Sequence, residues 1–183
     1  MRWESLFADL EAQLAAAGQA GLEAEIAERQ RGESASIGFT ARLRGQHGGP
    51  LKVYVDGVEE PLWGELRQVG AGWFLLKSSS TSHLVPLQAV RLVEGMGRFA
   101  AAEEGLVQLK LSSALRGVAR DRYPVRLQLR GAPAASVHGS IDRVGLDFLE
   151  FAVLEPGTAR RRENVASAAV VPFRAVAVIS STR

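Results

Sequence analysis

The feature that most constrains this chain of 183 residues is an internal repeat. Three blocks of sequence occur twice in the same order, in two units of about 70 residues each. The central block has a glycine, an aliphatic residue two positions later, a Val-Gly pair three positions after that, and then an aromatic residue followed by apolar ones. The paired blocks are 37–45 with 109–117, 63–76 with 138–151, and 84–93 with 170–179. The chain is therefore predicted to contain two copies of one structural unit.

Each unit is predicted to be rich in short strands. Apolar and polar residues alternate in 51–55 and in 125–129, which is typical of a half-buried strand. The repeated glycine inside the following strand indicates a sharp bend, and a Val-Pro strand pair ends each unit. Many short strands with one capping helix are typical of a small bent barrel. Closure of such a barrel would remove the exposed edges of its sheet.

Two local features complete the predicted unit. A short strand leads to Thr40 or Ser112, each of which is expected to act as the N-cap of a short helix. Gly70 and Gly145 follow the glycine-containing strand, and we expect them to supply positive φ in a tight turn.

The first 32 residues are predicted to form an amphipathic helical segment. Apolar side chains recur there at spacings of three and four residues, which places them on one face of a helix. They are Trp3, Leu6, Phe7, Leu10 and Leu14. Leu22 and Ile26 resume the pattern after two glycines. This stripe either covers the chain's own barrels or docks a partner, which could be a second copy of the chain.

The repeated unit resembles an Sm-like barrel. The block Gly139-x-Ile141, continuing through Asp147-Phe148, resembles the first motif of that family, and Val171–Ile179 resembles the second. The chain as a whole also resembles actinobacterial proteins with two such barrels. The resemblance implies a mainly β fold with some α-helix, made of two tandem Sm-like five-stranded bent β-barrels, each with a short helix. The implied division is a helical segment at 1–32, a first barrel at 33–100 and a second barrel at 101–183.

The resemblance also implies RNA binding, because Sm-like proteins include RNA chaperones. The Lys-His pair of the bacterial family's second motif falls on Leu87-Gln88 in the first unit and on Phe173-Arg174 in the second. Only Arg174 could meet a phosphate or a base as that pair does. The first unit therefore departs from the family pattern, and the second retains one cation.

The distribution of charge favours the second unit as the nucleic-acid-binding part. Residues 1–33 have a net charge of −4, residues 34–106 a net charge of 0, and residues 107–183 a net charge of +6. Such asymmetry can attract an anionic partner, although a solvated surface is the simpler reading. The candidate nucleic-acid-binding residues are Arg116, Arg120, Arg122, Arg126, Arg160, Arg161, Arg162 and Arg174.

The sequence argues against catalysis. It has no cysteine, so disulfides, thiol nucleophiles and zinc ribbons are excluded. Its three histidines are isolated, and we interpret each as a surface or turn residue. No apolar run is long enough to span a membrane. We expect a cytoplasmic protein that binds without catalysis, with no metal, no cofactor and no membrane. RNA binding by the second barrel is the first hypothesis; a protein-interaction or scaffold module, acting through the N-terminal helix and the barrel faces, is the alternative.

Overall fold

The computed structural model describes residues 13, 18–19, 21–26, 28–29, 32, 35–101, 109–131, 136–155, 157–158 and 161–182. Contacts divide the chain into two units, Met1–Phe39 and Thr40–Arg183. In the first unit, every described residue up to Ser36 is helical, as the apolar spacing predicts. The predicted stripe of Trp3, Leu6, Phe7, Leu10 and Leu14 lies outside the described residues.

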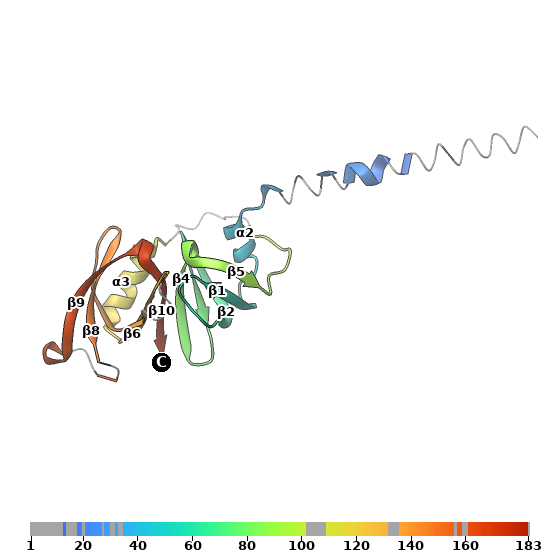
Figure 1. Cartoon of the computed structure of the whole chain (residues 1–183). Coiled ribbons are helices and arrows are strands. Elements are labelled where there is room, and N and C mark those ends of the chain that lie inside the picture. The colour runs from blue at the N-terminus through green and yellow to red at the C-terminus, as the bar shows by residue number, and fades with distance from the viewer. Residues whose placement is uncertain are drawn as a thin grey trace, which may run out of the picture. The chain divides into compact units, whose positions relative to one another are not determined.

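The second unit contains ten strands and two short helices among its described residues (Figure 1). We call residues 40–101 the first half and residues 109–182 the second half. The first half contains α2 (Phe39–Arg44), β1 (Pro50–Val55), β2 (Leu62–Gly70), β3 (Trp73–Lys77), β4 (Thr81–Pro86), the 3-10 turn η1 (Leu87–Ala89) and β5 (Val90–Glu94). Its helix α2 begins at Phe39, the last residue of the first unit. The second half contains α3 (Leu111–Asp121), β6 (Val125–Leu129), β7 (Ser136–Val144), β8 (Phe148–Leu154), η2 (Arg162–Asn164), β9 (Val165–Pro172), η3 (Phe173–Ala175) and β10 (Val176–Thr182).

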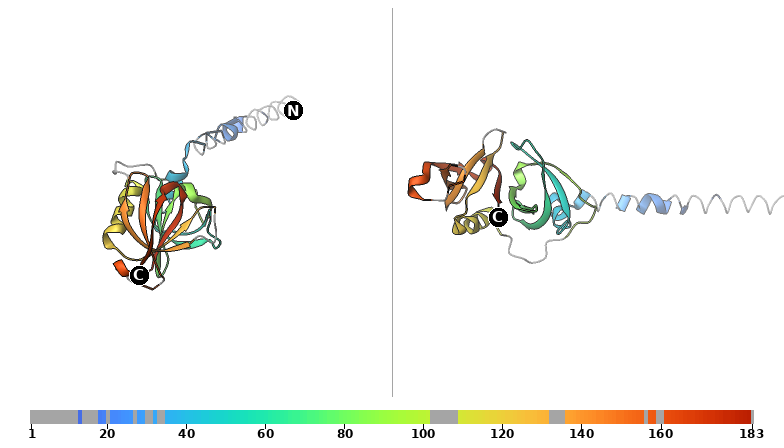
Figure 2. Two further views of the ribbon diagram at one scale, coloured as in Figure 1. Left: turned by 60° about the vertical axis from the view of Figure 1, so that its left-hand side comes forward. Right: turned by 90° about the horizontal axis from the view of Figure 1, so that it is seen from below.

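All ten strands belong to one antiparallel sheet, in the order β5-β1-β2-β3-β4-β10-β6-β7-β8-β9. The order of strands in the first half, fifth-first-second-third-fourth, is repeated in the second half. The strands of both halves curve strongly (Figure 2). The duplicated strand order agrees with the repeat in the sequence.

The predicted pair of closed five-stranded barrels is wrong. The chain forms one large open sheet, because β10 pairs with β6 on one side and with β4 of the other half on the other side. Neither β4 nor β9 pairs with the fifth strand of its own half, so neither half closes. Alternation of apolar residues determines which face of a strand is buried, but it does not determine which other strands pair with that strand.

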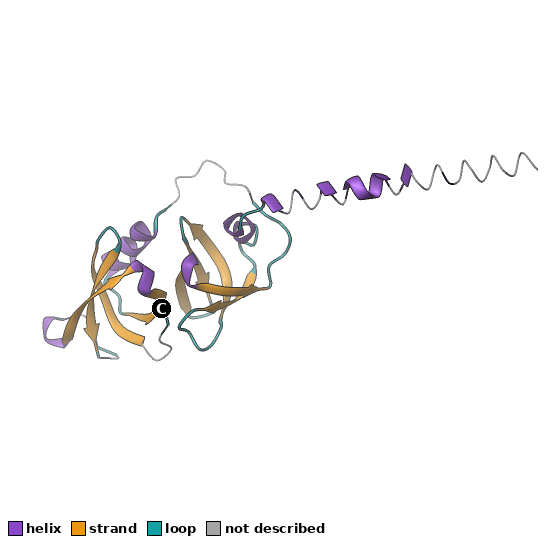
Figure 3. Cartoon of the chain, turned by 45° about the horizontal axis from the view of Figure 1, so that its top comes forward, coloured by secondary structure: helices purple, strands orange, loops and turns teal. Residues whose placement is uncertain are grey.

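The predicted caps of the two helices are also wrong. Thr40 lies inside α2, and α3 begins after Lys110, so Ser112 lies inside α3. Residues 35 and 36 are helical, and no strand leads directly into either helix among the described residues. Figure 3 shows α2 (residues 39–44) and α3 (residues 111–121) beside the strands of the two halves.

The repeated glycines Gly70 and Gly145 do not have positive φ; Gly72 does, with φ of 79°. Instead, a Cβ atom on Gly70 would collide with the indole of Trp73, and one on Gly145 with the ring of Phe148. The repeat therefore keeps a glycine where the aromatic residue of the following strand lies against the backbone.

Two hydrophobic cores lie in the second unit, and each draws residues from both halves. The core of the first half, around Phe74 and Leu66, includes Ala177 and Val178 from β10. The core of the second half, around Phe151, includes Trp73 and Leu84 from β3 and β4. Strands β4 and β10 thus contribute to a core on each of their two faces.

The turn between β1 and β2 is held against the turn after β6. Asp56 accepts a hydrogen bond from Arg91 at 2.8 Å and one from Arg130 at 3.3 Å. The hydrogen bond from Arg91 lowers the pKa of the Asp56 carboxyl below its usual 3.8, against the opposing effect of desolvation. Arg130 also donates to the carbonyl oxygen of Arg174 at 3.3 Å. One carboxylate therefore links a turn of the first half to the second half.

No helix in the described part of the chain is long and apolar enough to cross a membrane.

Candidate functional site

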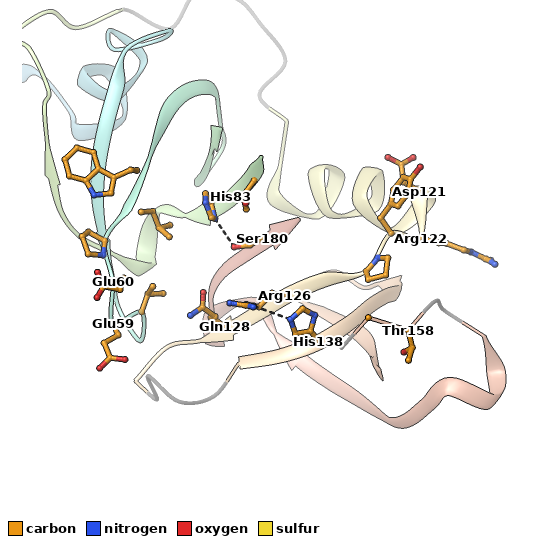
Figure 4. A pocket seen from close by; sticks show the side chains of 18 residues that line it. Glu59, Glu60, His83, Asp121, Arg122, Arg126, Gln128, His138, Thr158 and Ser180 are labelled. Carbon is orange, nitrogen blue, oxygen red and sulfur yellow. Dashed lines mark hydrogen bonds between the residues drawn. The ribbon is translucent and has the colours of Figure 1, made fainter. Parts of the chain in front are cut away.

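A pocket of about 1230 Å³ opens where the two halves of the sheet meet (Figure 4). Its floor comes from β4, β6, β7 and β10. Its walls come from the β1–β2 turn with the start of β2, from the end of α3, and from the loop after β8. The polar lining residues are Glu59, Glu60, Thr81, His83, Asp121, Arg122, Arg126, Gln128, His138, Thr158 and Ser180. Residues from distant parts of the sequence meet here because β10 joins the two halves.

A row of polar side chains crosses the floor of the pocket. His83, Ser180, Arg126 and His138 occupy directly opposite positions on the neighbouring strands β4, β10, β6 and β7. Directly opposite residues in an antiparallel sheet project to the same face. His83 Nδ1 lies 2.9 Å from Ser180 Oγ, and Arg126 Nε donates to His138 Nε2 at 3.3 Å. The register of the sheet therefore aligns two imidazoles, a hydroxyl and a guanidinium.

The same face of β4 and β10 is apolar further along the strands. Val85 and Val178, each two residues from a member of the polar row, are fully buried in the core of the first half. Leu84 and Ile179 point to the other face and pack in the core of the second half. The pocket is thus the part of this face that the first half leaves uncovered.

Two exposed aromatic side chains line the walls. Trp63, at the start of β2, is 61% exposed, and Tyr123, two residues after α3, is 66% exposed. Lys52 Nζ lies 5.1 Å from the ring centroid of Trp63 and is 3.3 Å from Glu94 Oε2. The ammonium therefore lies over the indole while much of the ring stays exposed.

Arg122 has an unusual backbone conformation. It follows α3 as its C-cap, with φ of 52° and ψ of 21°, and it is the one non-glycine residue of positive φ in the described part of the chain. Glycine is the residue that this left-handed position usually favours. Such strain clusters at functional sites, and Arg122 lines the pocket.

Burial lowers the pKa of the His83 imidazole below its usual 6.5. The neutral form of His83 is therefore favoured near neutral pH. A neutral imidazole offers one donor and one acceptor nitrogen, and one of them is already within hydrogen-bond distance of Ser180.

Two of the predicted nucleic-acid-binding arginines, Arg122 and Arg126, line the pocket, but Figure 4 shows the Arg122 side chain extending away from Arg126. Arg116 and Arg120 are exposed on α3, outside the lining of the pocket. Arg161 pairs with Glu163 at 4.0 Å, and Arg174 lies exposed in η3. Arg160 lies outside the described residues, and so does the side chain of Arg162.

Sequence reasoning missed the aromatic and histidine residues of the pocket. Trp63 and His138 begin the two copies of the central repeated block, so they occupy equivalent positions. Both of those positions line the pocket. The repeat thus contained a signal for this pair, whereas His83 and Tyr123 become neighbours of the pair only through the pairing of β4 with β10 and the end of α3.

Comparison with known protein families, with curated proteins and with solved structures returns no match. In the part of the chain that the structure describes, no group of three or more histidine, aspartate or glutamate residues is placed to hold a metal ion.

Proposed function

We propose that the chain binds single-stranded RNA and seats a nucleotide in the pocket. The observation that carries the proposal is the meeting of Arg122 and Arg126 with the exposed rings of Trp63 and Tyr123 in one concave site. Stacking of bases on aromatic rings beside cationic groups is how proteins hold single-stranded nucleic acid.

Charge and size support this proposal. The net charge of +6 over residues 107–183 attracts a polyanion at long range. The pocket volume of about 1230 Å³ exceeds the roughly 300–1,000 Å³ that is typical of small-molecule sites. Arg116 and Arg120 are exposed on α3, the helix that Arg122 terminates, and they can contact phosphates outside the pocket.

Binding of a fluorescent single-stranded oligonucleotide, followed by anisotropy over a range of salt concentrations, tests the proposal. We expect affinity to fall steeply with salt. Tyr123→Ala should cost about 1–3 kcal/mol of binding free energy through lost stacking. Arg126→Ala should weaken binding and reduce the slope of the salt dependence.

Arg98→Ala is the matched control, because Arg98 is exposed and does not line the pocket. Circular dichroism establishes that each variant is folded. Equal binding by wild type, Arg126→Ala and Tyr123→Ala would refute the proposal. Equal affinity for DNA and RNA of the same sequence would show that the chain binds single-stranded nucleic acid in general and does not select RNA.

A second candidate function is self-association through the N-terminal helix. Leu22 and Ile26 lie four residues apart in a helical segment and are 62% and 55% exposed. Leu22→Asp combined with Ile26→Asp should convert an oligomer to a monomer in sedimentation experiments while RNA binding by the second unit persists. A wild-type chain that sediments as a monomer contradicts this candidate.

A further inference from the structure

The charge balance of the pocket restricts what its ligand can be. Glu59, Glu60 and Asp121 line it together with only two guanidiniums, those of Arg122 and Arg126. Among the carboxylates and guanidiniums of the lining, the carboxylates outnumber the cations. A ligand that presented only phosphates would be repelled by the carboxylates. The pocket therefore suits a ligand that combines an anionic group with hydrogen-bond donors.

Two of the three acidic groups, Glu59 and Glu60, lie apart from the arginines, whereas Asp121 lies beside Arg122 at the end of α3. Figure 4 shows Glu59 and Glu60 on the wall formed by the β1–β2 turn, with Arg126 on the floor and Arg122 on the opposite side. A phosphate at Arg126 would leave the attached nucleoside free to extend toward the two glutamates.

Glu59 and Glu60 are available to a ligand. Both side chains are exposed, and neither has a hydrogen bond or ion pair to another described residue. Other carboxylates of the first half are engaged, since Glu65 lies 3.0 Å from Arg67 and Asp56 lies 2.8 Å from Arg91. Ionised carboxylates only accept hydrogen bonds, so this wall selects for groups that donate.

Among the RNA bases, guanine presents two adjacent donors, N1–H and N2–H, on its pairing edge. A carboxylate accepts such a pair of donors in a bidentate arrangement, which adds both strength and specificity. Uracil presents one N–H between two carbonyl oxygens, and a carboxylate repels these oxygens. Adenine and cytosine present one amino group beside a ring nitrogen that accepts.

We propose that the pocket selects guanine: Glu59 and Glu60 accept hydrogen bonds from its N1–H and N2–H edge, Tyr123 or the free side of Trp63 stacks on the base, and Arg126 binds the phosphate. This proposal rests on the proposed binding of RNA and names the nucleotide that the pocket holds. A free guanine nucleotide offers the same chemistry as guanosine within a strand.

The selection of guanine is tested with five labelled oligoadenylates that differ only in the central nucleotide. That nucleotide is guanosine, inosine, adenosine, cytidine or uridine. We expect the full-length wild-type chain to bind the guanosine oligonucleotide about tenfold or more tightly than the uridine one. Inosine lacks the N2 amino group and should fall between them. Glu59→Gln combined with Glu60→Gln should bring the affinity for guanosine down to that for adenosine.

Glu150→Gln combined with Glu163→Gln makes the same change of charge outside the pocket lining and should keep the preference for guanosine. Equal affinity of the wild type for all five oligonucleotides would overturn the selection of guanine while leaving RNA binding intact. If no oligonucleotide binds, titration with GMP and UMP decides: preferential binding of GMP supports the guanine site and overturns RNA binding, and binding of neither overturns both.

Discussion

At the scale of single residues, Arg122 is expected to favour RNA binding and to lower the folding stability of the chain. A left-handed backbone costs a non-glycine residue about 1 kcal/mol or more, and Arg122 adopts one with φ of 52° at the mouth of the pocket. Nothing in the geometry of α3 requires an arginine at this position, because glycine would end the helix with less strain. We therefore expect the Arg122 side chain to act outside the helix.

Arg122→Gly should raise the thermal midpoint and weaken RNA binding. The stabilisation should be about 0.5–1 kcal/mol, because glycine adopts the left-handed conformation without steric conflict. Calorimetry and anisotropy on the same preparation measure the two effects. Arg122→Ala keeps the strain and removes the cation, so it should lose binding without gaining stability. A glycine variant that binds as well as the wild type would show that Arg122 has no role in the site.

The depressed pKa of His83 makes stability depend on pH. As the pH falls below the usual histidine value of 6.5, the unfolded chain takes up a proton at this residue before the folded chain does. Stability therefore decreases between 6.5 and the lower pKa of the folded state, and this contribution is fully present only above 6.5. Thermal midpoints of wild type and His83→Gln, taken on both sides of this value, should diverge at acid pH, with the variant losing less stability. Parallel curves would contradict this origin.

Residue identities in the sequence indicated part of the site. Arg122 and Arg126 stood out because residues 107–183, the second copy of the repeat, are basic. His83 and His138 appeared isolated in the sequence, because their proximity depends on the pairing of β4, β10, β6 and β7. The positive φ of Arg122 was not predictable, since glycine and not arginine signals that conformation.

At the scale of elements, the repeated glycines show how each hairpin is built. In both hairpins the glycine at the end of one strand lies against the aromatic ring that begins the next, Gly70 with Trp73 and Gly145 with Phe148. The aromatic ring can pack in this way only because the glycine has no side chain. The hairpins β2–β3 and β7–β8 thus share one packing device.

Gly145→Ala should destabilise the chain, because its Cβ would overlap the Phe148 ring and force the ring to move. Overpacking of this kind costs about 1–3 kcal/mol. Gly117→Ala is the matched control: Gly117 lies within α3 with nothing within 4 Å of its added Cβ. That control should stabilise the chain by about 0.5–1 kcal/mol through helix propensity. Urea denaturation of both variants tests the contrast, and equal effects would argue against the packing role.

Most strands were predictable and the ends of the helices were not. Alternation in 51–55 and 125–129 matches β1 and β6 closely. Thr40 and Ser112 carry the chemistry of an N-cap, yet α2 begins at Phe39 and α3 follows Lys110 without a side-chain cap. Packing of Leu43 and Leu115 into the cores outweighs that local preference.

At the scale of the whole molecule, the two halves are structurally interdependent. The core of the first half contains Ala177 and Val178 from the last strand, and the core of the second contains Trp73 and Leu84 from the first half. Strand β4 would lose one of its two neighbouring strands if β10 were removed. The second unit should therefore unfold as one cooperative body.

A fragment limited to residues 35–101 should not fold independently. It retains β1 to β5, but it lacks the residues of β10 that complete its core, and it exposes the edge of β4. The fragment should show no cooperative thermal transition, while a fragment of residues 35–183 should show a single one. Circular dichroism and calorimetry measure both. A cooperative transition in the short fragment would show that the first half is an independent domain.

The repeat predicted two similar sets of strands, and the shared order of strands agrees with it. It could not predict an open sheet, because the sequences of β4 and β10 do not distinguish pairing within one half from pairing between halves. The pairing of β4 with β10 creates the pocket, so the position of the site could not be predicted from the sequence either.

The central place of β10 also has a consequence for synthesis of the chain. Residues 176–182 form the last strand of the described sheet in chain order and pair on both sides, with β4 and with β6. Until the ribosome releases them, β4 and β6 have no partner on these edges. The sheet can be completed only after the nine other strands of the described sheet have been translated, because β10 follows all of them in chain order. Nascent chains stalled before residue 176 would be the species most exposed to chaperones.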